Sequence, residues 1–231
     1  MGDPGWVDVP QRGMTSKAYA KELRKRIDPG KAGAVEPGDP WPYESEETTA
    51  LTVADKEGNM VAVNQTNVNS FGCGVVIPNT GILMNNAMYG LNPRPGTANS
   101  IDGRKRRIQN VCPAIVLRDG EGYMALGAPG GRNIQVSVAQ AIHHVIDYGM
   151  GIQDAVDAPR VTRETGTVFL DSRFPEETYR RMVEMGHDVS YVTPEIKSWG
   201  RPVGVLRDRD GILHGGVYSM LTGFASAAVG C

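Results

Sequence analysis

The stretch Glu47-Thr-Thr-Ala-Leu-Thr-Val-Ala-Asp-Lys-Glu-Gly-Asn-Met-Val-Ala-Val-Asn-Gln-Thr66 predicts a β-hairpin. Two runs rich in β-branched residues, 51–54 and 60–66, flank a turn sequence that contains Gly58 and Asn59. The hairpin would place Thr48 at the start of its first strand.

Thr48 is a candidate nucleophile. A threonine hydroxyl attacks well when the residue is first in its chain, because its own α-amine then acts as the general base. Thr48 is internal, so this chemistry requires cleavage between Glu47 and Thr48. The sequence equally allows a structural interpretation, in which Thr48 and Thr49 are β-branched residues at a strand edge.

A second informative stretch is Gly127-Ala-Pro-Gly-Gly131, which lies between a predicted strand and a predicted helix. Paired glycines before a helix expose backbone N–H groups, and the helix dipole adds positive potential. Such a turn can stabilise an oxyanion, although a plain strand-to-helix turn has the same composition.

The remaining polar residues narrow the chemistry. No Ser/His/Asp spacing stands out, and we interpret His143, His144, His187 and His214 as structural or surface residues. A nucleophile in this chain would therefore need a base other than histidine, and a terminal amine fits. The run Arg104-Lys-Arg-Arg107 is typical of a solvated face, and it could also hold an anionic substrate group or a partner chain.

The chain divides at the candidate cleavage site. Residues 1–47 contain one predicted amphipathic helix, 16–27, with Ser16 as a possible N-cap, and a linker rich in Pro, Gly and charge over 28–43. From Thr48 onward the pattern is that of a packed domain. It predicts strands at 75–77, 81–84, 113–117, 122–126, 188–192, 203–207 and 212–218, and helices at 133–148, 152–158 and 175–186. Strands and helices are expected to stack in layers.

Composition excludes several classes of protein. The net charge of −2 argues against a nucleic-acid surface, and no apolar run approaches the ~20 residues that span a bilayer. Met1 does not begin a secretory signal. The three scattered cysteines, Cys73, Cys112 and Cys231, predict neither a zinc site nor a disulfide framework. We therefore expect a cytoplasmic protein, with a periplasmic or secreted one as the alternative if a partner subunit carries the signal.

Several motifs in order resemble the small subunit of the γ-glutamyltranspeptidase family. The hairpin stretch carries the resemblance first. It continues through Phe71-Gly72, Thr80-Gly-Ile-Leu-Met-Asn-Asn86, Met88, Pro113-Ala-Ile-Val116, Gly127-Ala-Pro-Gly-Gly131, Asp147-Tyr-Gly149, Ala155, Ala158-Pro-Arg160 and Gly186-His-Asp-Val189. Residues 1–47 resemble the tail of the large subunit upstream of the cleavage site, and residues 48–231 the small, catalytic subunit.

The resemblance implies an N-terminal-nucleophile hydrolase with an α+β fold, a four-layer αββα sandwich whose sheets are shared with a large subunit. It implies cleavage between Glu47 and Thr48, with Thr48 as nucleophile, Thr66 as its support, and Gly130 and Gly131 as the oxyanion glycines. It implies neither a metal nor an organic cofactor. The partner would be the large subunit, in a heterodimer or a dimer of heterodimers.

The departures from the family pattern concern substrate recognition. Val68 stands where the family has an asparagine, Ala87 where it has a glutamine, and Gly90 where it has the aspartate that binds the substrate amine. Its paired serines fall at Gln109 and Asn110. Because a desolvated ammonium needs a carboxylate partner, we expect poor use of γ-glutamyl substrates, glutathione included.

The predicted function is amide hydrolysis through a threonyl acyl-enzyme. The predicted substrate pocket is lined by Asn85, Asn86, Tyr89, Gln109 and Asn110, and suits neutral or carboxylate-bearing acyl groups. The alternatives are a true γ-glutamyltransferase and a non-catalytic partner of a large subunit.

Overall fold

The computed structural model describes residues 5–7, 17–25, 28–31, 47–69, 71–163, 166–194 and 199–220. Its elements are, in order, α2 (Lys17–Arg24), β1 (Glu47–Ala54), β2 (Met60–Val68), η1 (Ala87–Gly90), β3 (Ala114–Arg118), β4 (Glu121–Gly127), η2 (Gly131–Asn133), α3 (Ile134–Ile146), α4 (Ile152–Asp157), β5 (Val161–Arg163), β6 (Val168–Asp171), α5 (Glu176–Glu184), β7 (Val189–Val192), β8 (Val203–Arg207) and β9 (Leu213–Val217).

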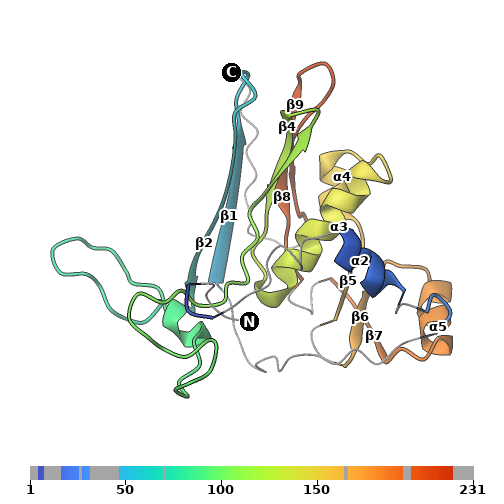
Figure 1. Cartoon of the computed structure of the whole chain (residues 1–231). Helices are drawn as coiled ribbons and strands as arrows, with labels where there is room; N and C mark the ends of the chain where they lie inside the picture. The colour runs from blue at the N-terminus through green and yellow to red at the C-terminus, as the bar shows by residue number, and fades with distance from the viewer. Residues whose placement is uncertain are drawn as a thin grey trace.

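Two sheets lie face to face in the larger part of the molecule (Figure 1). One is the antiparallel hairpin β1–β2, and the other is an antiparallel sheet in the order β3-β4-β8-β9. The two sheets approach closely because Gly127 of β4 has no side chain where it faces the hairpin. A Cβ at this position would lie 3.0 Å from Oδ1 of Asn64 and 3.2 Å from Cβ of Ala50. The inner face of the hairpin accordingly carries small or polar residues, apart from Met60 at the end beside Gly122.

Helices α3 and α4 cover the other face of the four-stranded sheet (Figure 1). Met124 and Leu126 of β4 are fully buried against Ile134 and Val138 of α3 and against Ala155 of α4. This apolar layer is the main core, and it explains why residues 124–131 are all buried.

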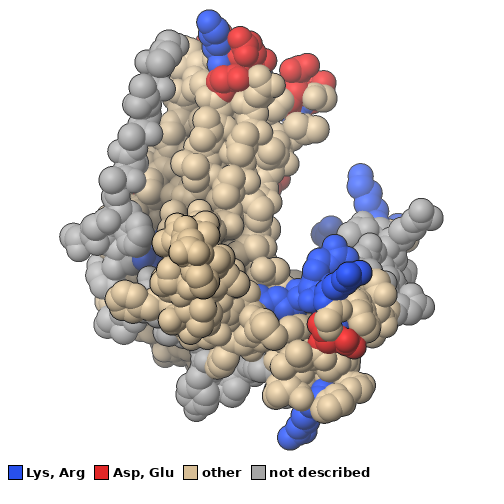
Figure 2. All heavy atoms as spheres, turned by 90° about the vertical axis from the view of Figure 1, so that its left-hand side faces the viewer, with Lys and Arg blue, Asp and Glu red and all other residues tan. Residues whose placement is uncertain are grey.

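The outer face of the hairpin is apolar and exposed. Leu51, Val53, Val61 and Val63 are between 40% and 56% exposed, and they alternate with the inward-facing residues of the two strands. Figure 2 shows this side of the molecule as a broad face without Lys, Arg, Asp or Glu, with charged side chains gathered near its upper end. An exposed apolar surface of this kind is typical of a site that another protein segment covers.

A third sheet, in the order β5-β6-β7, lies beside α5 (Figure 1). β5 and β6 are antiparallel, whereas β6 and β7 are parallel and connected through α5.

Several predictions from the sequence are confirmed: the α+β class, the hairpins at β1–β2 and β3–β4, and the three helices after Gly131. The described residues form three layers, α/β/β, of the expected sandwich.

Two expectations from the sequence were inaccurate. Residues 75–77 and 81–84 are not strands but the arms of a turn joined by one bridge, between Val76 and Leu83. β5 and β6 were missed, because they are short and follow Pro159 and Gly166. The N-cap Ser16 and most of the linker over 28–43 lie outside the described residues.

Candidate active site

Thr48 and Thr66 lie opposite each other in the hairpin register, near the start of β1 and the end of β2. Their hydroxyl oxygens are 3.1 Å apart, a hydrogen-bond distance, and the backbone N–H of Val68 donates to Oγ1 of Thr66 at 2.9 Å. The Thr66 hydroxyl is thus fixed by the backbone of its own strand and in turn fixes the Thr48 side chain.

A β-bulge interrupts the ladder at the candidate cleavage site. Glu47 pairs with Val68 and Thr48 with Thr66, so Asn67 is the extra residue. The bulge carries backbone strain, because Val68 is buried with φ = 72°, a left-handed conformation that β-branched residues avoid. The peptide bond between Glu47 and Thr48 therefore lies where the regular hairpin pairing breaks.

The glycine turn after β4 is fully buried and has an unusual backbone. Gly130 has φ = 126° and Gly131 has φ = 58°, and η2 begins at Gly131. A Cβ on Gly130 would lie 2.4 Å from Cα of Gly200 and 2.7 Å from the carbonyl oxygen of Trp199. The turn therefore has both a backbone conformation and a close neighbour that exclude a side chain at residue 130.

Asn64 links this turn to the threonine pair, a role that the sequence interpretation missed. Its Nδ2 donates a hydrogen bond of 2.6 Å to the carbonyl oxygen of Ala128. Asn64 lies two residues before Thr66 on the same face of β2. The sequence does hold a signal for this role, because Asn64 is a polar residue at an inward-facing position of the strand, between Ala62 and Thr66.

The predicted pocket residues lie on the segment after β2 and before β3. The backbone N–H of Asn86 donates to the carbonyl oxygen of Asn67 at 2.9 Å, which ties the start of η1 to the bulge. Oδ1 of Asn85 accepts the N–H of Ala87, and Oε1 of Gln109 accepts a hydrogen bond from Arg107. Tyr89 is 44% exposed, and Asn110 is half-buried. Asn85 and Gln109 thus serve local structure, while Asn86 is anchored beside the threonines.

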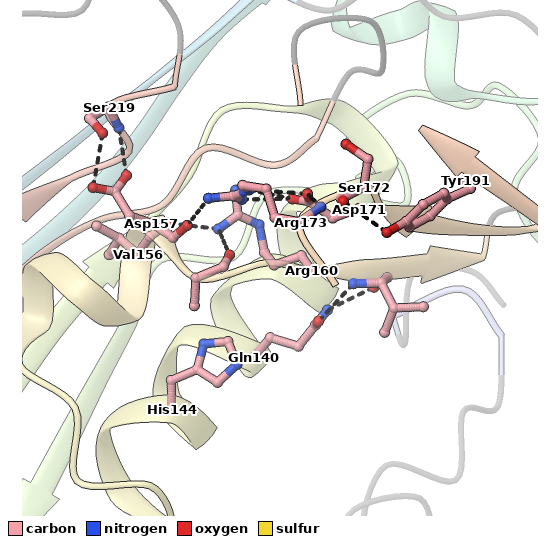
Figure 3. A network of polar contacts seen from close by, with 12 residues as sticks. Gln140, His144, Val156, Asp157, Arg160, Asp171, Ser172, Arg173, Tyr191 and Ser219 are labelled. Atoms are coloured by element: carbon pink, nitrogen blue, oxygen red, sulfur yellow. Dashed lines mark hydrogen bonds and ion pairs between the residues drawn. The ribbon is translucent and has the colours of Figure 1, made fainter. Parts of the chain in front are cut away.

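A second polar cluster, which the sequence did not reveal, surrounds buried Arg160 (Figure 3). Its Nη1 donates to the carbonyl oxygens of Val156 and Ala158, and its guanidinium stacks on the Tyr218 ring with a distance of 4.4 Å to the centroid. Burial lowers the pKa of Arg160 and raises that of Tyr218. This cluster holds the segment after β9 against α4.

Asp157 and Asp171 complete this cluster (Figure 3). Asp157 accepts hydrogen bonds from the N–H and the hydroxyl of Ser219 at 2.7 and 2.9 Å. Arg173 forms an ion pair with buried Asp171 at 2.6 Å and donates to the carbonyl oxygen of Asp157. These contacts connect α4 to the end of β6, in the third sheet, and to the segment after β9.

Neither a metal site nor a membrane span is found in the part of the chain that the structure describes. There, no group of three or more His, Cys, Asp or Glu side chains is arranged to hold an ion. Likewise, none of the helices described is long and apolar enough to cross a bilayer.

Comparison with known proteins places these features in a family. The family profile described as Gamma-glutamyltranspeptidase matches residues 1–224. The glutathione hydrolase proenzyme of Escherichia coli (strain K12) is 34% identical over 230 residues, which are 93% of this chain and 39% of that protein. The acylase ACY 1 proenzyme of Pseudomonas sp. (strain SE83) is 41% identical over 192 residues, which are 81% of this chain and 33% of that protein. The chain therefore spans between a third and two fifths of the length of these relatives.

Solved structures agree with the sequence matches. The cephalosporin acylase from Bacillus halodurans superimposes with a TM-score of 0.84 at 30% identity, over 100% of this chain and 42% of the acylase chain. A γ-glutamyltranspeptidase variant from Helicobacter pylori gives a TM-score of 0.65 at 30% identity, over 74% of this chain and 98% of the other. About three quarters of this chain thus corresponds to a nearly complete chain of the second structure.

Proposed function

Because the chain belongs to the γ-glutamyltranspeptidase family, we propose that it is the nucleophile-bearing part of a self-processing amidohydrolase. The observation that carries the proposal is the pair of hydroxyls of Thr48 and Thr66, 3.1 Å apart beside the β-bulge at Glu47. Cleavage after Glu47 would make Thr48 the first residue of its chain and free its α-amine. The chain would then divide into a large-subunit tail, 1–47, and a catalytic subunit, 48–231.

The bulge favours cleavage at this bond. The uncut peptide is outside regular strand pairing, and the Thr48 hydroxyl is held in place by Thr66. In the proposed reaction, Oγ1 of Thr48 attacks the carbonyl carbon of Glu47, the peptide C–N bond breaks, and the resulting ester is hydrolysed by water.

Amide hydrolysis would use the same hydroxyl. The free amine of Thr48 takes the proton of Oγ1 as the oxygen attacks the substrate carbonyl carbon, and backbone N–H groups of Gly130 and Gly131 stabilise the oxyanion. The substrate C–N bond then breaks, and the amine proton passes to the leaving amine. Water attacks the threonyl ester and releases the acid, so no external redox partner is involved. The positive φ angles of both glycines turn their backbone away from a normal helix start, which supports this assignment.

The exposed apolar face of the hairpin supports a large-subunit partner. Leu51, Val53, Val61 and Val63 form an uncharged surface on the side of the sandwich where the fourth layer is expected (Figure 2). A partner that covers it would complete the αββα arrangement and form a heterodimer. The proenzymes of Escherichia coli and Pseudomonas sp. extend well beyond the matched span, which covers 39% and 33% of them.

Amides other than glutathione are the proposed substrates. Gly90, Ala87 and Val68 lack the polar groups that the family resemblance assigns to γ-glutamyl recognition, and Asn85, Asn86, Tyr89, Gln109 and Asn110 remain as pocket residues. Relatives of both kinds match this chain, an acylase at 41% identity over 192 residues and a glutathione hydrolase at 34% over 230 residues, so the proposal rests on the pocket residues.

Intact mass spectrometry tests the proposal. The purified chain should convert to fragments 1–47 and 48–231, whereas Thr48→Ala should stay whole and hydrolyse no amide. Thr49→Ala, which alters the neighbouring exposed hydroxyl, is the matched control and should be cleaved normally. A chain that hydrolyses amides while remaining at full length would eliminate the amine as the base. A chain that is neither cleaved nor active with a large subunit present would be a structural partner only.

A further inference from the structure

Two backbone carbonyl groups of the glycine turn are held by N–H groups from other residues. The N–H of Arg201 donates to the carbonyl oxygen of Pro129 at 2.8 Å. The N–H of Asn133 donates to the carbonyl oxygen of Gly130 at 3.0 Å. In a planar trans peptide the C=O and N–H bonds point in opposite directions. These two contacts therefore fix the directions in which the N–H groups of Gly130 and Gly131 point.

The two N–H groups lie in a buried place beside the threonine pair. Gly130 and Gly131 are buried, and neither N–H donates a hydrogen bond to another residue in the described part of the chain. Buried N–H groups are nearly always paired, so two such groups in one turn are consistent with donors kept for an oxyanion. Asn64, on the same strand as Thr66, holds the carbonyl oxygen of Ala128 at the beginning of this turn.

The side chain of Asn133 forms a buried hydrogen bond to the third sheet. Asn133 directly precedes α3, a position where an asparagine side chain usually accepts an N–H of the first helical turn. Here the side chain does not cap the helix. Its Oδ1 instead accepts a hydrogen bond of 2.6 Å from Oγ1 of Thr162 on β5. Asn133 and Thr162 are 2% and 4% exposed, so water does not compete for this bond.

β5 is itself attached to α3 beside Thr162. Nε2 of Gln140 donates to the carbonyl oxygen of Val161 at 2.9 Å, and Oε1 of Gln140 accepts the N–H of Val161 at 3.0 Å (Figure 3). Gln140 lies about two helical turns after Asn133, so both side chains are on the face of α3 that meets β5. Thr162 is therefore on a strand whose position is fixed, and it can hold Asn133 in a defined place.

Asn133 also packs against the segment that leads to Arg201. A Cβ at Gly200 would lie 2.6 Å from the carbonyl oxygen of Asn133 and 2.4 Å from Oγ of Ser137. A shift of Asn133 would therefore disturb both the residue that holds Gly130 and the neighbour of the residue that holds Pro129.

We propose that Thr162 and Asn133 are positioning residues for the glycine turn. The hydroxyl of Thr162 holds Asn133, and the N–H of Asn133 holds the carbonyl oxygen of Gly130. The N–H of Gly131 is thereby directed towards the oxygen that becomes negative in the tetrahedral state. The inference rests on the proposed function, whose oxyanion donors it supplies with their support. Neither side chain touches the substrate or transfers a proton.

The kinetic test uses chain that has been cut after Glu47, with glutaryl p-nitroanilide as the probe. Thr162→Val keeps the shape of the side chain and removes the donor. Loss of a whole oxyanion donor lowers turnover roughly 10²–10³-fold, and this variant only misdirects one, so kcat should fall about 10-fold. KM should change little, because the interaction is made only in the transition state. Thr162→Ser keeps a hydroxyl and should recover most of kcat; turnover as slow as that of Thr162→Val would overturn the assignment.

Gln140→Ala is the matched control, since it loosens β5 from α3 and leaves the bond between Thr162 and Asn133 in place. It should lower the urea midpoint of unfolding but keep kcat close to that of the unchanged chain. Equal losses of kcat in Gln140→Ala and Thr162→Val would show a general loss of rigidity and refute the positioning role.

A double-variant comparison tests whether the two residues act as one unit. Thr162→Val combined with Asn133→Ala should be no slower than Asn133→Ala alone, because both changes remove the same hydrogen bond. Losses that multiply would show independent effects and contradict the pairing. If Thr162→Val does not fold, Asn133→Ala removes the bond from its acceptor side and is compared with Gln140→Ala in its place.

The outcomes separate this inference from the proposed function. Cleavage before Thr48 and hydrolysis of the anilide report on the function alone. If both occur and Thr162→Val keeps its kcat, the positioning role is refuted and the function stands. If no anilide is hydrolysed, the amide resonances of the ¹⁵N-labelled full chain decide. The Gly131 resonance should move in Thr162→Val but not in Thr162→Ser or Gln140→Ala, and an unmoved resonance in Thr162→Val refutes the inference.

Discussion

Replacement of Asn64 by alanine should weaken the connection between the threonine pair and the glycine turn. The lost bond is the 2.6 Å contact from Nδ2 of Asn64 to the carbonyl oxygen of Ala128, a residue with no exposed surface. Leaving a buried acceptor without its donor costs about 1–3 kcal/mol. Oδ1 of Asn64 is buried and accepts no hydrogen bond among the described residues. Its removal is therefore favourable and offsets part of the lost free energy of unfolding. We therefore expect the free energy of unfolding to fall by about 2 kcal/mol.

The assay is thermal and urea unfolding in a Thr48→Ala background, so that every molecule is uncut. For a chain of this length, about 2 kcal/mol corresponds to a fall in Tm of roughly 4–8 °C. Asn64→Asp should be at least as harmful, because a carboxylate cannot donate to a carbonyl oxygen. Gln65→Ala, on the exposed face of the same strand, should stay within about 0.5 kcal/mol.

In the chain with Thr48 intact, Asn64→Ala should also slow cleavage after Glu47, because the glycine turn is less well placed. Stability unchanged within 0.5 kcal/mol, or an equal effect of Gln65→Ala, would show that the bond does not couple the two parts of the site.

Gly130→Ala should lower turnover roughly 10²–10³-fold with a smaller effect on KM, because the new Cβ would displace Gly200 and the N–H donors of the turn. Steady-state kinetics measure both constants, and a change in KM alone would contradict this prediction. Activity of the cut chain should fall as the pH drops through the pKa of the Thr48 α-amine, ordinarily about 8, because the protonated amine cannot act as a base; a flat pH profile from 6 to 9 would exclude it. Asp157→Ala should cost about 1–2 kcal/mol in unfolding experiments by releasing Ser219, whereas Asp154→Ala on the same helix, with its exposed side chain, should cost much less. Cys112 should be alkylated more slowly than exposed Cys73 in peptide mapping at neutral pH, because burial raises the pKa of the Cys112 thiol and reduces its thiolate fraction.

The elements with strong local patterns could be predicted from the sequence. The hairpin around Gly58 and the helix after Gly131 are encoded by alternation, turn residues and helical spacing within short windows. The family motifs assigned site roles to Thr48, Thr66, Gly130 and Gly131. The structure brings the hydroxyls of Thr48 and Thr66 to hydrogen-bond distance.

Contacts between distant segments could not be predicted in the same way. Alternation does not say which face of β1–β2 is inside, and here the small residues face inward because Gly127 brings the sheets close together. Arg160 is buried, although arginine is mostly exposed in proteins, because its guanidinium contacts a carbonyl oxygen of α4 and the ring of Tyr218. The hydrogen bond from Thr162 to Asn133 joins positions 29 residues apart, and no local pattern encodes it.

The bare outer face of the hairpin has a consequence for local dynamics. Among the described residues, β1 and β2 pack against the rest of the molecule through their inner face, where most side chains are small or polar, so their opening should cost less free energy than global unfolding. Backbone amides of Leu51–Ala54 should therefore exchange with deuterium faster than those of α3, whose apolar side chains lie in the main core. A partner that covers Leu51 and Val53 would slow exchange throughout the hairpin. Deuterium uptake by β1 would then report occupancy of that face directly, without a substrate and without cleavage at Thr48.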